Sequence, residues 1–277
     1  IITISLYLLC INLTANAQVT QEWVAIYNDT TAGSNSIANA IAVDGAGNVY
    51  VTGTSGDFVT IKYNSSGVQQ WIARYNGGAE DAATAIAVDG SGNVYVTGYS
   101  SNGLHYAYAT IKYDSSGVQQ WAKTYTFNIN DDQKTVAIAV DALGNVYITG
   151  TRYGTVSTLM DYATIKYNSS GTQQWVQRYD GPVTGNDYAT AMVLDDAANV
   201  YVTGHSPGNG TQTDYATIKY DSSGVEQWVT RYNGPASSYD VASSIALNGS
   251  GNVYVTGYSM SSSSFGTEDY ATIKYNS

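Results

Sequence analysis

Apolar and polar residues alternate in short runs along almost the whole chain, and tight turn sequences separate the runs. In residues 84–125, Val94 and Val96 share one face of a run whose other face carries Tyr95 and Thr97. A period of two is typical of β-strands, and no segment shows the period of a helix. The pattern predicts four strands in this stretch, at residues 84–89, 93–99, 108–113 and 118–125.

The same unit recurs five times along the chain. Each copy contains a segment of the type Asn-Val-Tyr-Val-Thr-Gly, which begins at Asn48, Asn93, Asn145, Asn199 and Asn252. A Thr-Ile-Lys-Tyr segment follows, with its Thr at positions 60, 110, 164, 217 and 272. The fourth strand carries a tryptophan, so the five tryptophans are Trp23, Trp71, Trp121, Trp175 and Trp228. Repeats of about 45–55 residues are typical of propellers and related arrays.

Four short antiparallel strands repeated around an axis make the blades of a β-propeller. The first strand of each unit carries small residues, such as Ala85 and Ala87, which suit the crowded centre of a ring. The fourth strand would lie outermost, where its tryptophan can pack between neighbouring blades. No blade can cover both of its apolar faces alone, so the blades are expected to fold as an array. We therefore predict an all-β propeller of five four-stranded repeats.

The two ends of the array each contain part of a unit. Residues 21–27 have the pattern of a fourth strand, and residues 270–275 have the pattern of a third strand. Pairing these two segments would complete a fifth blade, close the ring and remove two open sheet edges. The alternative is that the repeats form an arc of a larger ring.

The beginning of the chain has the pattern of an export signal. Residues 1–13 are apolar, and Ala15-Asn16-Ala17 resembles a cleavage site before Gln18. We expect residues 1–17 to be a signal peptide whose start is truncated, and residues 18–277 to be the repeat domain. The only cysteine, Cys10, lies in the signal, so the exported domain would have no disulfide. The predicted location is secreted or at the cell surface, with the periplasm as an alternative.

The net charge of −11 restricts the partners of the domain. An acidic surface repels phosphate backbones and anionic lipids, so nucleic acid and membrane insertion are not expected. A protein or a glycan at the cell exterior is the expected partner. The domain is expected to be monomeric unless it is part of a longer chain.

The repeated motifs resemble a known family. The string from Asp214 to Trp228, followed by Gly251-Asn-Val-Tyr-Val-Thr-Gly257, is similar to the SBBP β-propeller repeat of exported and surface proteins of bacteria. The resemblance implies a propeller, and the family's name implies seven blades where five copies are present. The family has no agreed catalytic residues that could be transferred. A looser similarity to quinoprotein-type propeller repeats extends only to the layout of a blade.

Two short motifs suggest chemistry but have simpler explanations. Residues 204–208 match G-x-S-x-G, yet they align with the ends of other second strands and no later histidine could act as the base of a hydrolase. Asp89-Gly-Ser-Gly-Asn93 offers oxygen atoms to calcium, but a hairpin turn explains the same residues. No cofactor is therefore expected, with calcium as a weakly supported alternative.

The loops between strands two and three, and between strand four and the next unit, vary between copies. Strand alternation places all of them on one rim, where binding sites on rigid scaffolds usually lie. Two aspartate positions recur on this rim: Asp81, Asp187 and Asp240 before the first strand, and Asp57, Asp161, Asp214 and Asp269 at the start of the third. We predict an acidic, tyrosine-rich mouth for a cation or a glycan. The alternative is that these aspartates cap loops by accepting backbone N–H groups.

The function that follows is a non-enzymatic binding or scaffolding module without catalytic residues. One alternative is a hydrolase or lyase acting on polysaccharide, using rim carboxylates such as Glu80, Asp81, Asp131 or Asp132. Another alternative is an architectural fragment of a larger surface protein.

Overall fold

The computed structural model describes residues 19–29, 35–126, 134–153, 159–264 and 266–276. Within them every regular element is a β-strand, and the strands form five antiparallel sheets, here called blades 1 to 5. Blade 1 contains β1 (Ile37–Val43), β2 (Val49–Ser55), β3 (Asp57–Tyr63) and β4 (Gln69–Tyr75). Blade 2 contains β5 (Glu80–Val88), β6 (Val94–Ser101), β7 (Tyr106–Tyr113) and β8 (Gln119–Tyr125). Blade 3 contains β9 (Lys134–Val140), β10 (Val146–Tyr153), β11 (Met160–Tyr167) and β12 (Gln173–Tyr179). Blade 4 contains β13 (Tyr188–Leu194), β14 (Val200–Pro207), β15 (Thr213–Tyr220) and β16 (Glu226–Tyr232). Blade 5 contains β17 (Asp240–Leu247), β18 (Val253–Met260) and β19 (Glu268–Tyr275).

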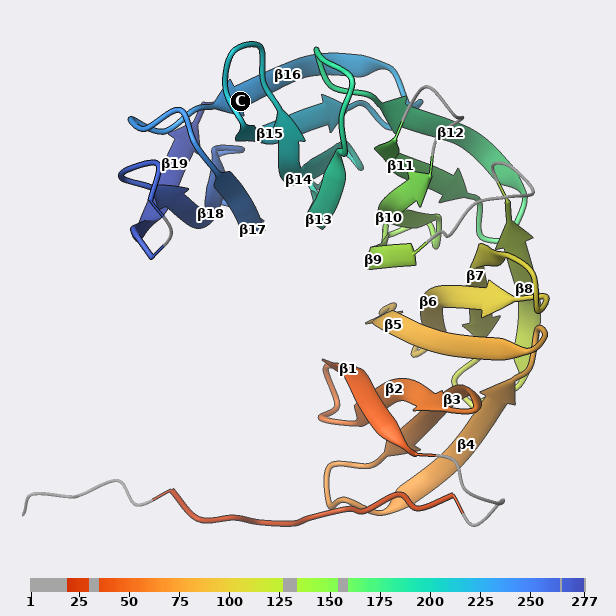
Figure 1. The fold of residues 1–277 in the computed structure, drawn as a ribbon. Coiled ribbons are helices and arrows are strands. Elements are labelled where there is room, and N and C mark those ends of the chain that lie inside the picture. The colour runs from red at the N-terminus through yellow and green to blue at the C-terminus, as the bar shows by residue number, and fades with distance from the viewer. Residues whose placement is uncertain (1–18, 30–34, 127–133, 154–158, 265, 277) are drawn as a thin grey trace, which may run out of the picture.

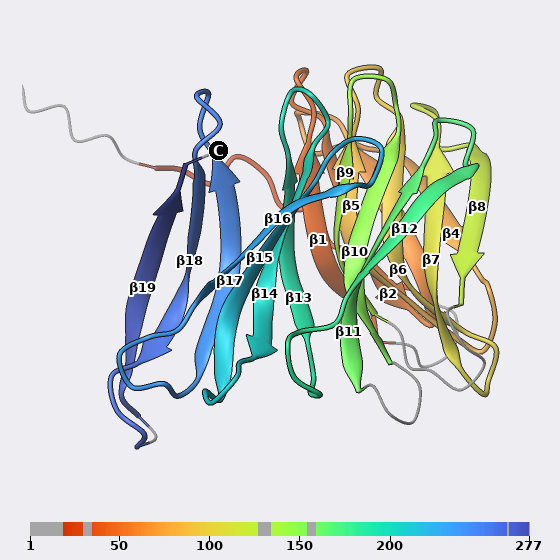
Figure 2. The same ribbon diagram turned by 90° about the horizontal axis from the view of Figure 1, so that it is seen from above.

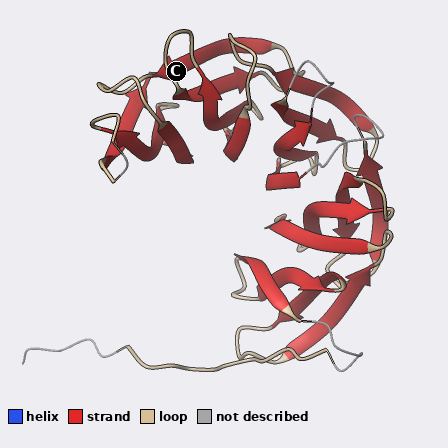
Figure 3. Cartoon of the chain, in the orientation of Figure 1, coloured by secondary structure: helices blue, strands red, loops and turns tan. Residues whose placement is uncertain are grey.

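The blades are arranged around a common axis, with the first strand of each blade innermost and the fourth outermost (Figures 1 and 3). Neighbouring first strands contact one another along the inside of the arc. The predicted all-β class, the strand order and the radial arrangement are therefore confirmed. The four strands predicted for residues 84–125 correspond to β5–β8, with ends that differ by a few residues.

The glycine that ends each Asn-Val-Tyr-Val-Thr-Gly segment is required by a close approach of two strands. At Gly98, an added Cβ would lie 2.0 Å from the backbone oxygen of Ala82 in the first strand. The register between first and second strands shifts at this level in every blade, as it does between Ala83 and Ala85. Any side chain here would push the first strand away, which explains why all five copies keep glycine.

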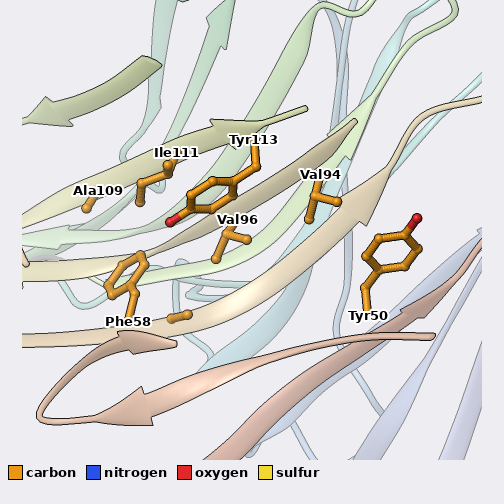
Figure 4. Close-up of a cluster of buried hydrophobic side chains, with 8 residues drawn as sticks. Tyr50, Phe58, Val94, Val96, Ala109, Ile111 and Tyr113 are labelled. Atoms are coloured by element: carbon orange, nitrogen blue, oxygen red, sulfur yellow. The ribbon is translucent and has the colours of Figure 1, made fainter. Parts of the chain in front are cut away.

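The hydrophobic core lies between blades. Figure 4 shows Tyr50 and Phe58 of blade 1 facing Val94, Val96 and Ile111 of blade 2, and all five side chains are fully buried. Equivalent clusters join blades 2 and 3, blades 3 and 4, and blades 4 and 5. Because each cluster needs side chains from two blades, the blades stabilise one another as an array.

The tryptophans pack between blades, as predicted. The indole of Trp71 covers Gly117 in the turn of the next blade, and its Nε1–H donates to the backbone oxygen of Ser115 at 3.1 Å. The same bond joins Trp121 to the oxygen of Ser169 and Trp175 to that of Ser222.

The predicted closure of the ring is not formed. Residues 19–29 are extended but lie outside the five sheets, and Trp23 packs against Tyr63 of blade 1. Among the described residues β19 pairs only with β18, so residues 21–27 do not pair with residues 270–275. Figure 1 shows the resulting open arc, with a wide gap between blade 5 and blade 1.

The predicted signal peptide, residues 1–17, lies outside the described residues. The part of the chain that the structure describes contains no helix with the length and apolar character needed to cross a membrane.

Candidate ligand site on the variable rim

The arc has two different rims. Tight turns join first to second strands and third to fourth strands along one edge, and connections of variable length, from the single residue Gly56 to longer loops, lie along the opposite edge (Figure 2). We call this second edge the variable rim. It is formed by the connections between second and third strands and between each fourth strand and the next blade.

On the opposite rim, one carboxylate organises the turn between first and second strands in blades 1 to 4, and Asn248 takes its place in blade 5. Asp44 Oδ1 accepts hydrogen bonds from the backbone N–H groups of Ala46 and Asn48, at 3.0 and 2.9 Å. Its Oδ2 accepts from the Asn48 side chain and the Tyr50 hydroxyl, at 2.8 and 2.9 Å. Burial raises the pKa of Asp44, but these hydrogen bonds outweigh it and lower the pKa to about 2. Both oxygens are occupied by protein donors, which is the arrangement expected of a hairpin turn.

The first set of predicted site residues caps the connections between blades. The side chains of Asp81, Asp187 and Asp240 are at most 1% exposed. In each case Oδ2 accepts the backbone N–H of a glycine that follows the preceding fourth strand. The distances are 2.7 Å from Gly77, 3.1 Å from Gly181 and 2.6 Å from Gly234. This geometry agrees with the capping interpretation, and ligand contact by these three carboxylates stays a prediction.

Three of the acidic side chains meet where blade 3 adjoins blade 4. Oxygen atoms of Asp161, Asp180 and Asp187 lie within 4.8 Å of one another, close enough to share a cation. Two guanidinium groups also reach this cluster. Arg178 Nε lies 2.8 Å from Asp161 Oδ2 and its Nη2 lies 2.7 Å from Asp180 Oδ2, while Arg152 Nη2 lies 3.1 Å from Asp161 Oδ2. Arginine therefore supplies the positive charge that a metal ion would otherwise bring.

Burial and neighbouring charge raise the pKa of Asp187 to about 6. Removal from water is the largest cause, and the charges of Asp161 and Asp180 act in the same direction. Hydrogen bonds from Ser206 and Gly181 partly offset these effects.

Two aspartates of the second set, Asp161 and Asp214, are held by an arginine of the fourth strand, whereas Arg74 of blade 1 pairs with Asp29. Arg231 donates to Asp214 Oδ2 at 3.0 Å, and it also reaches the Ser206 hydroxyl at 2.7 Å and the Tyr179 hydroxyl at 2.9 Å. Asp161 is held in the same way by Arg178, whereas Asp269 on β19 is exposed. Their predicted contact with a ligand also stays a prediction, because what the geometry shows directly is a clamp that joins the strands of a blade.

The structure reveals a cavity that the sequence reasoning missed. It has a volume of about 600 Å³, lies between blades 3 and 4, and is lined by Lys134, Thr151, Met160, Tyr188 and His205 among others. The His205 ring stacks on Tyr188 with 5.1 Å between ring centroids. Burial lowers the pKa of His205 to about 4, so this imidazole is neutral at pH 7. The cavity therefore combines an apolar wall with an ammonium group, a hydroxyl and a neutral imidazole.

Two lining pairs occupy a place in the blade where the residue of the first strand differs in all five blades. Lys134 is paired with Thr151, and Tyr188 with His205. The equivalent pairs are Ile37 with Thr54, Ala82 with Tyr99, and Val241 with Tyr258. Comparing the copies position by position within the strands would have found this variation, whereas comparing only the loops does not.

Three stretches of the chain match the profile of the SBBP family, described as a beta-propeller repeat: residues 22–57, 70–105 and 227–265. The chain thus carries SBBP repeats, and the resemblance drawn from its motifs is confirmed. No curated protein matches the chain.

Solved structures give the same fold at low sequence identity. The Dos1 propeller matches with a TM-score of 0.53 and 10% identity, over 80% of this chain and 53% of that chain. A protein of unknown function from Dyadobacter fermentans matches with a TM-score of 0.52 and 9% identity, over 85% of this chain and 74% of that chain. A gluconolactonase from Xanthomonas campestris matches with a TM-score of only 0.47 and 11% identity, over 86% and 72% of the two chains. At these identities the first two likenesses show the fold alone, and nothing is inferred from the third.

Proposed function

We propose that the chain is a non-enzymatic, exported binding module whose ligand enters the cavity between blades 3 and 4. The observation that carries this proposal is the cavity itself. It is a concave, largely apolar space with a few polar groups on rigid strands, and its lining differs from the equivalent places in the other blades.

The ligand class that suits this lining is a short saccharide with one carboxylate, such as a uronic acid. Tyr188 and Met160 provide apolar surface for the face of a sugar ring. Lys134 provides a cation for the carboxylate, and Thr151 and the neutral His205 can hydrogen-bond to hydroxyl groups. The net charge of −11 disfavours long polyanions, so one or two acidic groups fit better than many.

A binding role is favoured over hydrolysis because the described residues that line the cavity include no Asp or Glu. Glycoside hydrolysis normally needs two carboxyl groups on either side of the scissile bond. A histidine with a pKa near 4 is also a weak general base at neutral pH.

The test is a glycan array followed by titration calorimetry with the strongest saccharide, with and without calcium. We expect binding of a uronic-acid glycan without release of shorter sugars, and a loss of at least about tenfold in affinity for Lys134→Met. Lys62→Met is the matched control. Lys62 also lies over a tyrosine ring, at 5.2 Å against 5.3 Å for Lys134, but it does not line this cavity.

If no glycan on the array is bound, either with or without calcium, the glycan proposal is contradicted. Cleavage of the bound saccharide would contradict the non-enzymatic one. If Lys134→Met and Lys62→Met lose affinity equally, the ligand does not bind in this cavity.

A further inference from the structure

Comparison of the five copies shows that an arginine in the fourth strand accompanies an aspartate in the third. The arginine lies three residues after the tryptophan, and the aspartate lies near the start of the third strand. Three copies have both residues and one copy has neither: Asp57 with Arg74, Asp161 with Arg178, Asp214 with Arg231, and Ala107 with Thr124. The two positions therefore change together.

In blades 3 and 4 the structure gives the physical reason for this pairing, whereas in blade 1 Arg74 pairs with Asp29. In blade 4 the guanidinium of Arg231 binds Asp214, the hydroxyl of Ser206 in the second strand and the hydroxyl of Tyr179 in the preceding blade. A half-buried arginine without its carboxylate would lose its strongest partner, so the loss of one residue favours the loss of the other.

Where the pair is missing, a hollow remains in its place. In blade 2 a cavity of about 310 Å³ is lined by Ala107, Thr124 and Ser100, among other residues. These three residues occupy the positions of the aspartate, the arginine and the serine of blade 4. The arginine side chain thus fills this space in a blade that carries the arginine.

Blade 5 presents the partners of such an arginine. A cavity of about 350 Å³ lies beside β19 and is lined by Asp269, Ser259 and Tyr232, among others. They correspond to Asp214, Ser206 and Tyr179, the three side-chain partners of Arg231. We call Asp269, Ser259 and Tyr232 the arginine socket.

Two further observations show that the socket lacks a partner within the described chain. The Ser259 hydroxyl is buried and has no hydrogen-bond partner among the described residues. Tyr270, next to Asp269, is 99% exposed, whereas the equivalent Tyr215 is fully buried beside Tyr232 of its fourth strand. Both would be covered by a fourth strand on the edge of β19.

Residues 21–27 are poorly matched to this socket. Aligned with the other fourth strands, they place Trp23 and Tyr27 correctly but have Ile26 where Arg231 stands. An isoleucine would leave the carboxylate of Asp269 and the hydroxyl of Ser259 without donors. In blade 2 a fourth strand without the arginine pairs with a third strand without the aspartate. Residues 21–27 also lack the arginine, so they suit a third strand that has no aspartate.

We propose that the edge of β19 is an acceptor site for an extended segment of the type Gln-x-Trp-x-x-Arg-Tyr, and that Asp269 selects the arginine. The backbone of this segment would add a strand to blade 5, and its arginine would enter the socket. The edge of β19 is expected to bind a strand with the sequence pattern of β16 in preference to residues 21–27.

The test uses three peptides and the full chain. The peptides are Glu-Gln-Trp-Val-Thr-Arg-Tyr, which copies residues 226–232, the same peptide with Arg→Ile, and Gln-Glu-Trp-Val-Ala-Ile-Tyr, which copies residues 21–27. Fluorescence anisotropy gives the affinities, and hydrogen exchange locates the protected amides. We expect the arginine peptide to bind about tenfold more tightly than the other two and to protect β19.

Asp269→Ala should remove this preference, and Glu268→Ala is the matched control because it deletes a neighbouring exposed carboxylate on the same strand. Three results would overturn the proposal: binding of no peptide, equal or tighter binding of the residue 21–27 peptide, or equal effects of the two variants. Protection of β19 by the chain's own residues 21–27 would overturn it as well.

Discussion

The contact between tryptophan and glycine allows a quantitative test of how the blades hold together. Gly117 has φ +86°, and a Cβ added there would lie 2.7 Å from the Trp71 ring of the preceding blade. Gly67, Gly171 and Gly224 show the same two features against Trp23, Trp121 and Trp175. Replacing Gly117 with alanine therefore disturbs both the backbone of one blade and its contact with the next.

The two effects can be separated in magnitude. An alanine with positive φ costs about 1–2 kcal/mol. Displacing the indole is an overpacking change, which costs about 1–3 kcal/mol, and it also strains the hydrogen bond from Trp71 to Ser115. We expect Gly117→Ala to lower the free energy of unfolding by about 2–5 kcal/mol in total.

Gly56→Ala is the matched control, because Gly56 has φ +80° and no atom within 4 Å of the added Cβ. It should cost only the backbone term, about 1–2 kcal/mol. Urea unfolding followed by tryptophan fluorescence measures both variants. If the two substitutions destabilise the chain equally, the tryptophan contact contributes nothing and the reasoning fails.

Three further predictions concern charged and polar groups. His205 has a pKa of about 4, below its ordinary value of 6.5, so the unfolded chain takes up the proton first and stability is lost as pH falls from 6.5 to 4. In the His205→Tyr variant, the free energy of unfolding should fall by about 3 kcal/mol less over that pH range than in the unchanged chain. Urea unfolding at several pH values measures this, and identical pH profiles for the two proteins would refute it. In blade 2, Thr124→Arg alone should destabilise the chain, while adding Ala107→Asp should restore at least about 1 kcal/mol, and a double-mutant cycle without coupling would count against the arginine clamp. Asp141→Asn should lower the free energy of unfolding by less than about 1 kcal/mol, because blade 5 has Asn248 at this place and keeps the two backbone hydrogen bonds, at 3.0 and 2.9 Å. Asp141→Ala should lower it by about 2 kcal/mol, since the backbone N–H groups then lose their acceptor. Thermal melts that show equal losses for the two variants would contradict this account.

The sequence predicted the blade well because each strand is specified locally. Alternation fixes which residues face a neighbouring blade, and the turn glycines fix the hairpins. The tryptophans were recognisable for the same reason, since they recur at one position of the repeat. The shape of the array was not specified in this way. The angle between blades depends on side chains such as Tyr50 and Val94 packing across an interface, and the repeat itself is the same in a ring or in an arc.

The sequence predicted where the aspartates of the variable rim lie, but not what surrounds them. Counting turns placed Asp81, Asp187 and Asp240 on the variable rim, and the structure has them there. Their burial could not be predicted, because it depends on a glycine N–H that becomes available only when the preceding blade ends nearby. The cavity with Lys134 and His205 was missed because the repeat draws attention to what the copies share.

The first connection of the array shows which of these residues serve the fold. Here Ser36 replaces the capping aspartate, and Asp29 replaces the glycine that would donate to it. The carboxylate of Asp29 accepts a hydrogen bond from Ser55 at 3.0 Å and pairs with Arg74. A carboxylate is therefore retained beside the second-strand serine even though it comes from a different position in the chain. Such compensation is expected where the group stabilises the fold.

The lining of the cavity between blades 3 and 4 follows no such rule. Lys134 and Tyr188 have Ile37, Ala82 and Val241 at the equivalent positions, so charged, aromatic and aliphatic side chains all occur there. The stability of a blade evidently does not require any particular side chain at this position. The variation therefore leaves this place free to differ from blade to blade, which is the property that a ligand site on a repetitive scaffold needs.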